Sequence, residues 1–96
     1  MTSSNQRNRR SEEPTEALHF LYEACRERGG FELLALADER GDFISGSSTT
    51  QDLSPGAMRR ILMKVLDVPF ELCVHGAGDE REVEHALAGT HRILAA

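Results

Sequence analysis

The seven residues 31–37, FELLALA, are almost continuously apolar. A run this short is typical of a central strand with both faces covered, because a stable helix needs a longer segment. The charged residues 38–42, DERGD, then form a turn in which the glycine can adopt positive φ. Residues 43–46, FISG, return as a second strand. Residues 31–46 therefore predict a β-hairpin at the centre of the fold.

A helix is predicted on each side of this hairpin in the sequence. Pro14 favours the first turn of one helix, which ends at the glycine pair 29–30. Asp79 begins another and, with Glu82 three residues on, resembles a capping box. Apolar positions at helical spacing give each helix one buried face: Leu18, Leu21, Tyr22 and Cys25 in the first, and Val83, Leu87, Thr90 and Leu94 in the last.

The middle of the chain also carries a helical pattern. Ser54 followed by Pro55 is a strong helix start, and the residue before Pro69 is pushed out of the helical region. We therefore predict a helix over residues 54–67. Its buried stripe is Met58, Ile61, Leu62 and Val65, with Arg59, Arg60 and Lys64 facing away. Residues 70–75 alternate apolar and polar and predict a third strand.

These elements predict an α/β fold of the α+β type in the order α-β-β-α-β-α. We expect one domain over residues 14–96, with a small, mostly antiparallel three-stranded sheet and helices on both of its faces. Residues 1–13 are polar and lack a hydrophobic period, which predicts a disordered N-terminal tail. The expected core includes Leu34, Leu36, Ile61, Leu62, Leu72 and Leu87.

Composition excludes several classes of partner. The net charge of −5 opposes binding to the phosphate backbone of nucleic acid. No apolar stretch approaches the 18 or so residues of a membrane span. Cys25 and Cys73 form no C-x-x-C motif and lie in apolar patterns, which favours buried, reduced thiols and a cytoplasmic protein.

No constellation of catalytic or ligand-binding residues stands out. The glycine-containing turn at 75–79, HGAGD, precedes a helix whose first turns are acidic and would repel a phosphate. Glu82 and His85 have E-x-x-H spacing, but no second such motif accompanies them. His19 and Glu23 form an i, i+4 surface pair. We therefore expect no enzyme, no catalytic residue, no cofactor and no metal site.

Residues 31–48, FELLALADERGDFISGSS, preceded by a helix, resemble the hairpin of the Roadblock/LC7 family. Residues 86–94, ALAGTHRIL, are similar to the last helix of some bacterial members. The resemblance implies a non-catalytic regulatory module that forms dimers and binds or regulates a small GTPase or a motor-associated complex. The family usually has five strands, whereas this pattern predicts three. A small GAF-like ligand-sensing domain shares the hairpin and is the alternative.

Self-association is expected from the predicted sheet. With strand order 2-1-3, residues 70–75 lie at an edge, and an uncovered apolar edge strand is one that proteins cover or pair. We therefore expect a homodimer, a complex with another cytoplasmic protein, or both. The candidate contact residues are Arg59, Arg60, Met63, Lys64, Phe70, Leu72 and Cys73.

Overall fold

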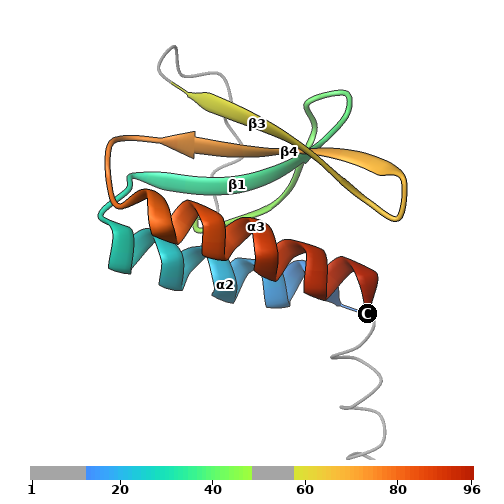
Figure 1. Cartoon of the computed structure of the whole chain (residues 1–96), viewed down its shortest axis with the longest axis horizontal. Helices are drawn as coiled ribbons and strands as arrows, with labels where there is room; N and C mark the ends of the chain where they lie inside the picture. The colour runs from blue at the N-terminus through green and yellow to red at the C-terminus, as the bar shows by residue number, and fades with distance from the viewer. Residues whose placement is uncertain (1–12, 49–57) are drawn as a thin grey trace, which may run out of the picture.

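A computed structural model describes residues 13–48 and 58–96. In this part of the chain, two helices lie side by side against one face of a four-stranded antiparallel sheet (Figure 1). The strands follow the order β2-β1-β4-β3. The elements are α2 (Pro14–Gly29), β1 (Leu33–Asp38), β2 (Phe43–Gly46), β3 (Arg59–Val65), β4 (Val68–His75) and α3 (Glu80–Ala95).

The predicted fold class is confirmed, but the middle of the chain is not a helix. Residues 59–65 form β3, so the sheet has four strands rather than three, and the helix predicted over 54–67 is wrong in this part. The predicted helix start at Ser54 and Pro55 lies outside the described residues, as does the predicted tail up to residue 12. The helices also share one face of the sheet instead of covering both (Figure 1).

A two-residue turn joins β3 to β4. Leu66 and Asp67 have φ values of 52° and 68°, as in the type I′ turns that connect tight hairpins. The ladder runs from Val65 opposite Val68 at the turn to Arg59 opposite Val74. Since the turn sequence lacks the glycine or asparagine that normally marks a type I′ turn, the sequence does not signal this hairpin.

The ends of both helices follow the predicted signals. Gly30 adopts the left-handed conformation, with φ 81°, and its N–H caps the Arg26 carbonyl. Asp79 is the N-cap of α3, where its carboxylate accepts a hydrogen bond from the Arg81 N–H. The predicted capping box does not form, because the Asp79 carboxylate caps residue 81 rather than residue 82 and the Glu82 side chain turns toward α2.

The main core fills the space between the helices and the sheet. Leu34, Leu36 and Leu72 are fully buried there, as predicted, and Ile61 and Leu87 pack against them at the margin. The prediction for Leu62 is wrong: this side chain is 77% exposed. In a strand its neighbours Ile61 and Met63 point to the helices, so Leu62 points to the other face. Buried residues of both helices complete the cluster: Leu18, Tyr22, Cys25, Val83 and Ala86.

Strand β1 is buried on both faces, which confirms it as a central strand. On the face away from the helices, Leu33, Ala35 and Ala37 form a second small cluster with Cys73 of β4. The two helices are held together in the core by a polar contact as well. The Tyr22 hydroxyl donates to Thr90 Oγ1, because that oxygen's own proton goes to the Ala86 carbonyl, 2.7 Å away.

The junction between α2 and α3 depends on close backbone approach. The Asp79 N–H donates to the Gly29 carbonyl over 2.9 Å. Gly78 lies so near that a Cβ on it would stand 2.3 Å from the Gly29 carbonyl oxygen. The end of α2 and the start of α3 can meet only because residue 78 has no side chain.

Candidate protein-interaction surface

Four of the predicted contact residues come together on β3, one edge of the sheet. Arg59, Arg60, Met63 and Lys64 all belong to this seven-residue strand, which has no strand on its outer side in the described part of the chain. The prediction that residues 70–75 form an edge is wrong, because β4 lies between β1 and β3. The sheet does end on this side, but its edge strand is β3, the neighbour of β4.

The other three predicted contact residues are less accessible. Leu72 and Cys73 are fully buried, so neither can contact a partner in the folded chain. Phe70 is half-buried opposite Met63 on the side of the sheet that faces the helices. The accessible part of the predicted surface is therefore its four residues on β3.

The pairing pattern shows which backbone groups of β3 point outward. In a two-residue hairpin the residues flanking the turn, here Val65 and Val68, form a hydrogen-bonded pair, and pairs then alternate along the ladder. Lys64 is thus in a non-hydrogen-bonded pair, which agrees with its partner Pro69 having no N–H to donate. By the same alternation, Leu62 and Lys64 direct their N–H and C=O groups away from β4.

Exposed apolar side chains gather on the same hairpin. Leu62 on β3, Leu66 in the turn and Val68 at the start of β4 are 77%, 72% and 50% exposed. A hollow of about 350 Å³ lies beside them, lined by Leu62, Met63, Lys64, Pro69 and Phe70. Leu66 is also held at positive φ, which is unusual for a bulky residue. The sequence reading missed this patch because it placed Leu62 in the core.

The cations of β3 are largely matched by acidic groups of the same chain. Arg59 makes a bidentate ion pair with Glu80, with N–O distances of 2.9 and 3.1 Å. Arg60 pairs with Glu71, its cross-strand diagonal neighbour, at 3.2 Å. Because these ion pairs neutralise Arg59 and Arg60, the β3 edge does not present a strong positive field to its surroundings.

The opposite edge, β2, is obstructed. This strand has four residues, and a bulge between its pairs with Leu36 and Ala37 interrupts its ladder. The His19 ring Nδ1–H donates to the Gly46 carbonyl over 2.7 Å, and the Ser45 hydroxyl donates to the Thr15 carbonyl over 2.6 Å. The sequence reading paired His19 with Glu23 and so missed this contact with the strand. A short, bulged edge tied to α2 is poorly suited to strand pairing.

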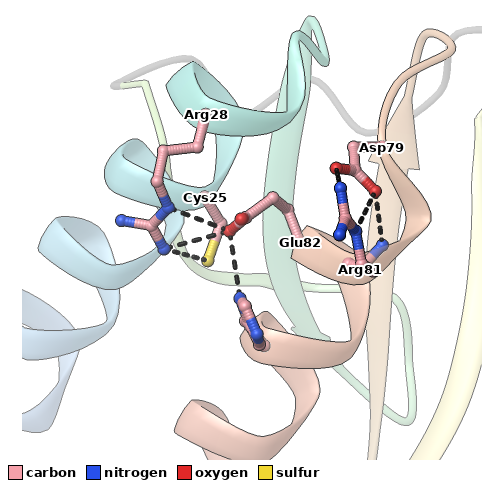
Figure 2. Close-up of polar contacts among 6 residues, drawn as sticks. Cys25, Arg28, Asp79, Arg81 and Glu82 are labelled. Atoms are coloured by element: carbon pink, nitrogen blue, oxygen red, sulfur yellow. Dashed lines mark hydrogen bonds and ion pairs between the residues drawn. The ribbon is translucent and has the colours of Figure 1, made fainter.

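A polar cluster joins the helices at some distance from β3 (Figure 2). The largely buried Glu82 carboxylate accepts hydrogen bonds from Arg28 Nε and Nη2, at 3.1 and 3.0 Å, and from His85 Nδ1 at 3.3 Å. Arg28 also lies 3.8 Å from the Cys25 sulfur. Burial raises the pKa of the Cys25 thiol, so this cysteine is not an activated nucleophile. The arrangement ties α2 to α3.

This cluster predicts a pH-dependent contribution to stability. The hydrogen bonds from Arg28 lower the pKa of Glu82 in the folded chain. A carboxyl group with a lowered pKa stabilises the fold at pH values above its ordinary pKa, and that stabilisation is lost as pH falls through the folded value. We expect Glu82→Gln to reduce stability at neutral pH and to reduce it progressively less toward acidic pH.

Urea unfolding of both proteins at about pH 7 and about pH 3 tests this expectation. Other carboxyl groups with lowered pKa values, among them Asp38 and Asp79, remain in the variant. The informative quantity is therefore the difference between the two proteins at each pH. An equal difference at both pH values would show that Glu82 is not ionised in this contact.

Residues 13–48 and 58–96 contain no group of three or more His, Cys, Asp or Glu side chains arranged to bind a metal ion. None of the helices in these ranges combines the length and apolar content needed to cross a membrane. Comparison of the chain with protein-family models, with curated proteins and with solved structures finds no match.

Proposed function

We propose that this chain is a non-catalytic protein-interaction module of the cytoplasm that binds an extended strand of a partner protein along β3. The observation that carries the proposal is the contrast between the two sheet edges. β3 has seven residues, with outward backbone groups at Leu62 and Lys64, whereas His19 and a bulge obstruct β2. Strand addition draws its affinity from main-chain hydrogen bonds and its specificity from alternate side chains.

The side chains beside the edge suit such a partner. Leu62 and Leu66 together offer exposed apolar surface next to the outward backbone groups. A partner strand added along β3 would cover this apolar surface and would also form hydrogen bonds with the outward backbone groups of β3. The hairpin's resemblance to Roadblock/LC7 proteins is in keeping with a regulatory module of this kind, and a small GTPase or a cytoplasmic complex is the type of partner that the resemblance suggests.

The ligand-sensing alternative receives less support. A domain that senses a small ligand usually holds it in a largely enclosed, apolar pocket. Within residues 13–48 and 58–96, the hollows beside β2, β3 and the start of α3 are each lined partly by exposed residues such as Glu16, Leu62 and Glu80. They lie at the surface rather than within the core between helices and sheet.

A single backbone substitution tests the proposal. Leu62→Pro removes an N–H that points away from β4, so the ladder between β3 and β4 stays intact. Leu62→Ala is the matched control, because it also removes the leucine side chain but keeps the N–H. We expect peptides selected against the wild-type chain from a displayed random library to bind Leu62→Ala and to lose binding to Leu62→Pro.

Equal binding to both variants would show that partners attach elsewhere and would contradict the proposal. Recovery of no binding peptide would also contradict it. Far-ultraviolet circular dichroism and thermal melting confirm that each variant is folded. We expect the two variants to differ little in melting temperature, since edge strands tolerate proline where its missing N–H would face solvent.

A further inference from the structure

One cation of the β3 edge is not matched by a carboxylate from the described part of the chain. The two arginines of this strand are paired with Glu80 and Glu71. Lys64, by contrast, forms no ion pair with any described residue. Its exposed ammonium group is therefore available to an acidic group that arrives from outside the chain.

The surroundings of Lys64 explain why its charge is unmatched. Pro69 stands directly opposite on β4, and Leu62 precedes it by two residues on the same face of the strand. Glu71 lies diagonally across the ladder, but its carboxylate contacts Arg60 at 3.2 Å instead. The hollow of about 350 Å³ beside the edge is lined by Lys64 and four apolar residues: Leu62, Met63, Pro69 and Phe70. The ammonium group thus stands alone on a mainly apolar surface.

The outward backbone groups determine which residues of an added strand reach this surface. In antiparallel addition, the partner residues directly opposite Leu62 and Lys64 form hydrogen-bonded pairs and share their face of the sheet. The partner residue between them points to the other face, beside Met63. Antiparallel addition would continue the pattern of the three ladders between the described strands, and it is slightly more stable per residue than parallel pairing.

Each position of the added strand favours a particular kind of side chain. An aspartate or glutamate opposite Lys64 would form a cross-strand ion pair, which is stabilising, whereas a like charge there is destabilising. Apolar residues are favoured opposite Leu62, which is 77% exposed, and opposite Met63 and Ile61, which are half-buried at the margin of the core. Since the two strands run in opposite directions, the acidic residue precedes the apolar ones in the partner's sequence.

We infer, on the basis of the proposed function, that the strand received by β3 is an acidic–apolar segment of another protein. Its sequence is an aspartate or glutamate followed by three apolar residues. The segment lies antiparallel to β3 with its acidic side chain opposite Lys64, and the apolar residues lie opposite Met63, Leu62 and Ile61 in that order. A segment with a basic residue in the first position would place like charges opposite each other, so Lys64 also selects against such partners.

Three short synthetic peptides test this pattern. They share the same serine and threonine flanks and differ at one residue, with Glu-Val-Ile-Val, Gln-Val-Ile-Val or Lys-Val-Ile-Val at the centre. Fluorescence anisotropy measures the dissociation constant of each for the wild-type chain. We expect the Glu peptide to bind about 1.5- to 5-fold more tightly than the Gln peptide, and the Lys peptide to bind more weakly than both. No detectable binding of the Glu peptide would contradict the acidic–apolar pattern.

Lys64→Glu is the decisive variant, because it reverses the charge at one residue and leaves the backbone groups of β3 in place. We expect this variant to bind the Lys peptide more tightly than the Glu peptide, the reverse of the wild-type order. Arg40→Glu is the matched control: it makes the same change in net charge at an exposed side chain of the β1–β2 turn and should keep the wild-type order. An unchanged order in Lys64→Glu, or the same reversal in Arg40→Glu, would overturn the contact with Lys64.

A peptide of reversed sequence tests the direction of the added strand. Val-Ile-Val-Glu, bound antiparallel with its glutamate opposite Lys64, would carry its three apolar residues past the end of β3 and into the turn. We therefore expect its affinity to respond to Lys64→Glu no more than to Arg40→Glu. If the reversed peptide depends on Lys64 as strongly as the Glu peptide should, the antiparallel direction is wrong.

The acidic–apolar pattern and the proposed function fail separately. Peptides that need the Leu62 amide but ignore the charge of residue 64 contradict only the pattern, whereas peptide binding that is insensitive to Leu62→Pro contradicts the proposed function. The mass in solution distinguishes a further occupant. A dimer of the 10.6 kDa chain that excludes the peptides, and that Leu62→Pro dissociates, would assign the edge to a second copy and overturn the acidic–apolar partner.

Discussion

Leu36→Ala is expected to lower the free energy of unfolding by about 2–5 kcal/mol, as is typical for a buried leucine. Leu36 is fully buried and lies in the central strand β1, opposite Ser45 on one side and Leu72 on the other. Neither β2 nor β4 can move to fill the cavity, because such a movement would break the hydrogen bonds that pair it with β1. Since small domains are stable by only about 5–15 kcal/mol, this variant should be largely or fully unfolded at moderate urea concentrations.

Leu62→Ala is the matched control for this experiment. Both residues are strand leucines that the sequence placed in the core, but Leu62 is 77% exposed. Its truncation should change stability by less than about 0.5 kcal/mol in the monomer. Urea unfolding of both variants, at a dilution at which each is monomeric, provides the comparison. Similar losses for both would contradict the difference in burial between Leu36 and Leu62.

Gly78→Ala is expected to lower stability by about 1–3 kcal/mol, a range typical of overpacking a tight contact. The added Cβ would stand 2.3 Å from the Gly29 carbonyl oxygen and 3.1 Å from the Phe31 ring. The nearest obstacle is backbone, which cannot rotate away as a side chain does. The start of α3 must therefore move, and the hydrogen bond from the Asp79 N–H to Gly29 should weaken.

Ala77→Ser is the matched control, because it adds one atom at the exposed neighbouring position. It should leave stability within about 0.5 kcal/mol of wild type. Thermal melting measures both variants, and amide exchange at Asp79 reports the hydrogen bond directly. If Gly78→Ala melts like Ala77→Ser and keeps Asp79 protected, the close approach of the two helix ends does not constrain the fold.

The elements that could be predicted from the sequence are those with local signals. The helices are marked by proline at the start of α2, glycine at its end and Asp79 before α3. The glycine and Asp79 cap backbone groups that the helix ends leave unpaired, and proline lacks the N–H that would otherwise be unpaired there. The β1–β2 hairpin has a charged, glycine-containing turn between two apolar runs. In each case, the interaction that decides the structure lies between residues close together in sequence.

The middle segment could not be predicted in this way, because its pattern suits two structures. Met58, Ile61, Leu62 and Val65 have helical spacing, yet Ile61, Met63 and Val65 also alternate as in a strand. Which pattern holds depends on pairing with β4, a contact that neither segment signals alone. The type I′ turn has leucine at the first of its two positive-φ positions and no glycine or asparagine, so the turn is not recognised from the sequence.

The candidate site was predicted only in part, for the same reason. The helical pattern of the middle segment predicts contact residues at Arg59, Arg60, Met63 and Lys64, and these residues lie on an accessible strand. The predictions for Leu72 and Cys73 depend on an edge at β4, but β3 pairs with that strand and both side chains are buried. The contact of His19 with Gly46 joins residues 27 positions apart and has no sequence pattern.

The obstruction of β2 has a consequence for the size of any assembly. If two chains join at β3, the outer edges of the combined sheet are both β2 strands, each bulged and tied to its helix by His19. Growth by further strand addition would have to break those ties at every step. Within the described residues, the histidine contact that obstructs β2 would thus stop such association at two chains and would protect a protein with an open β edge from extending into filaments.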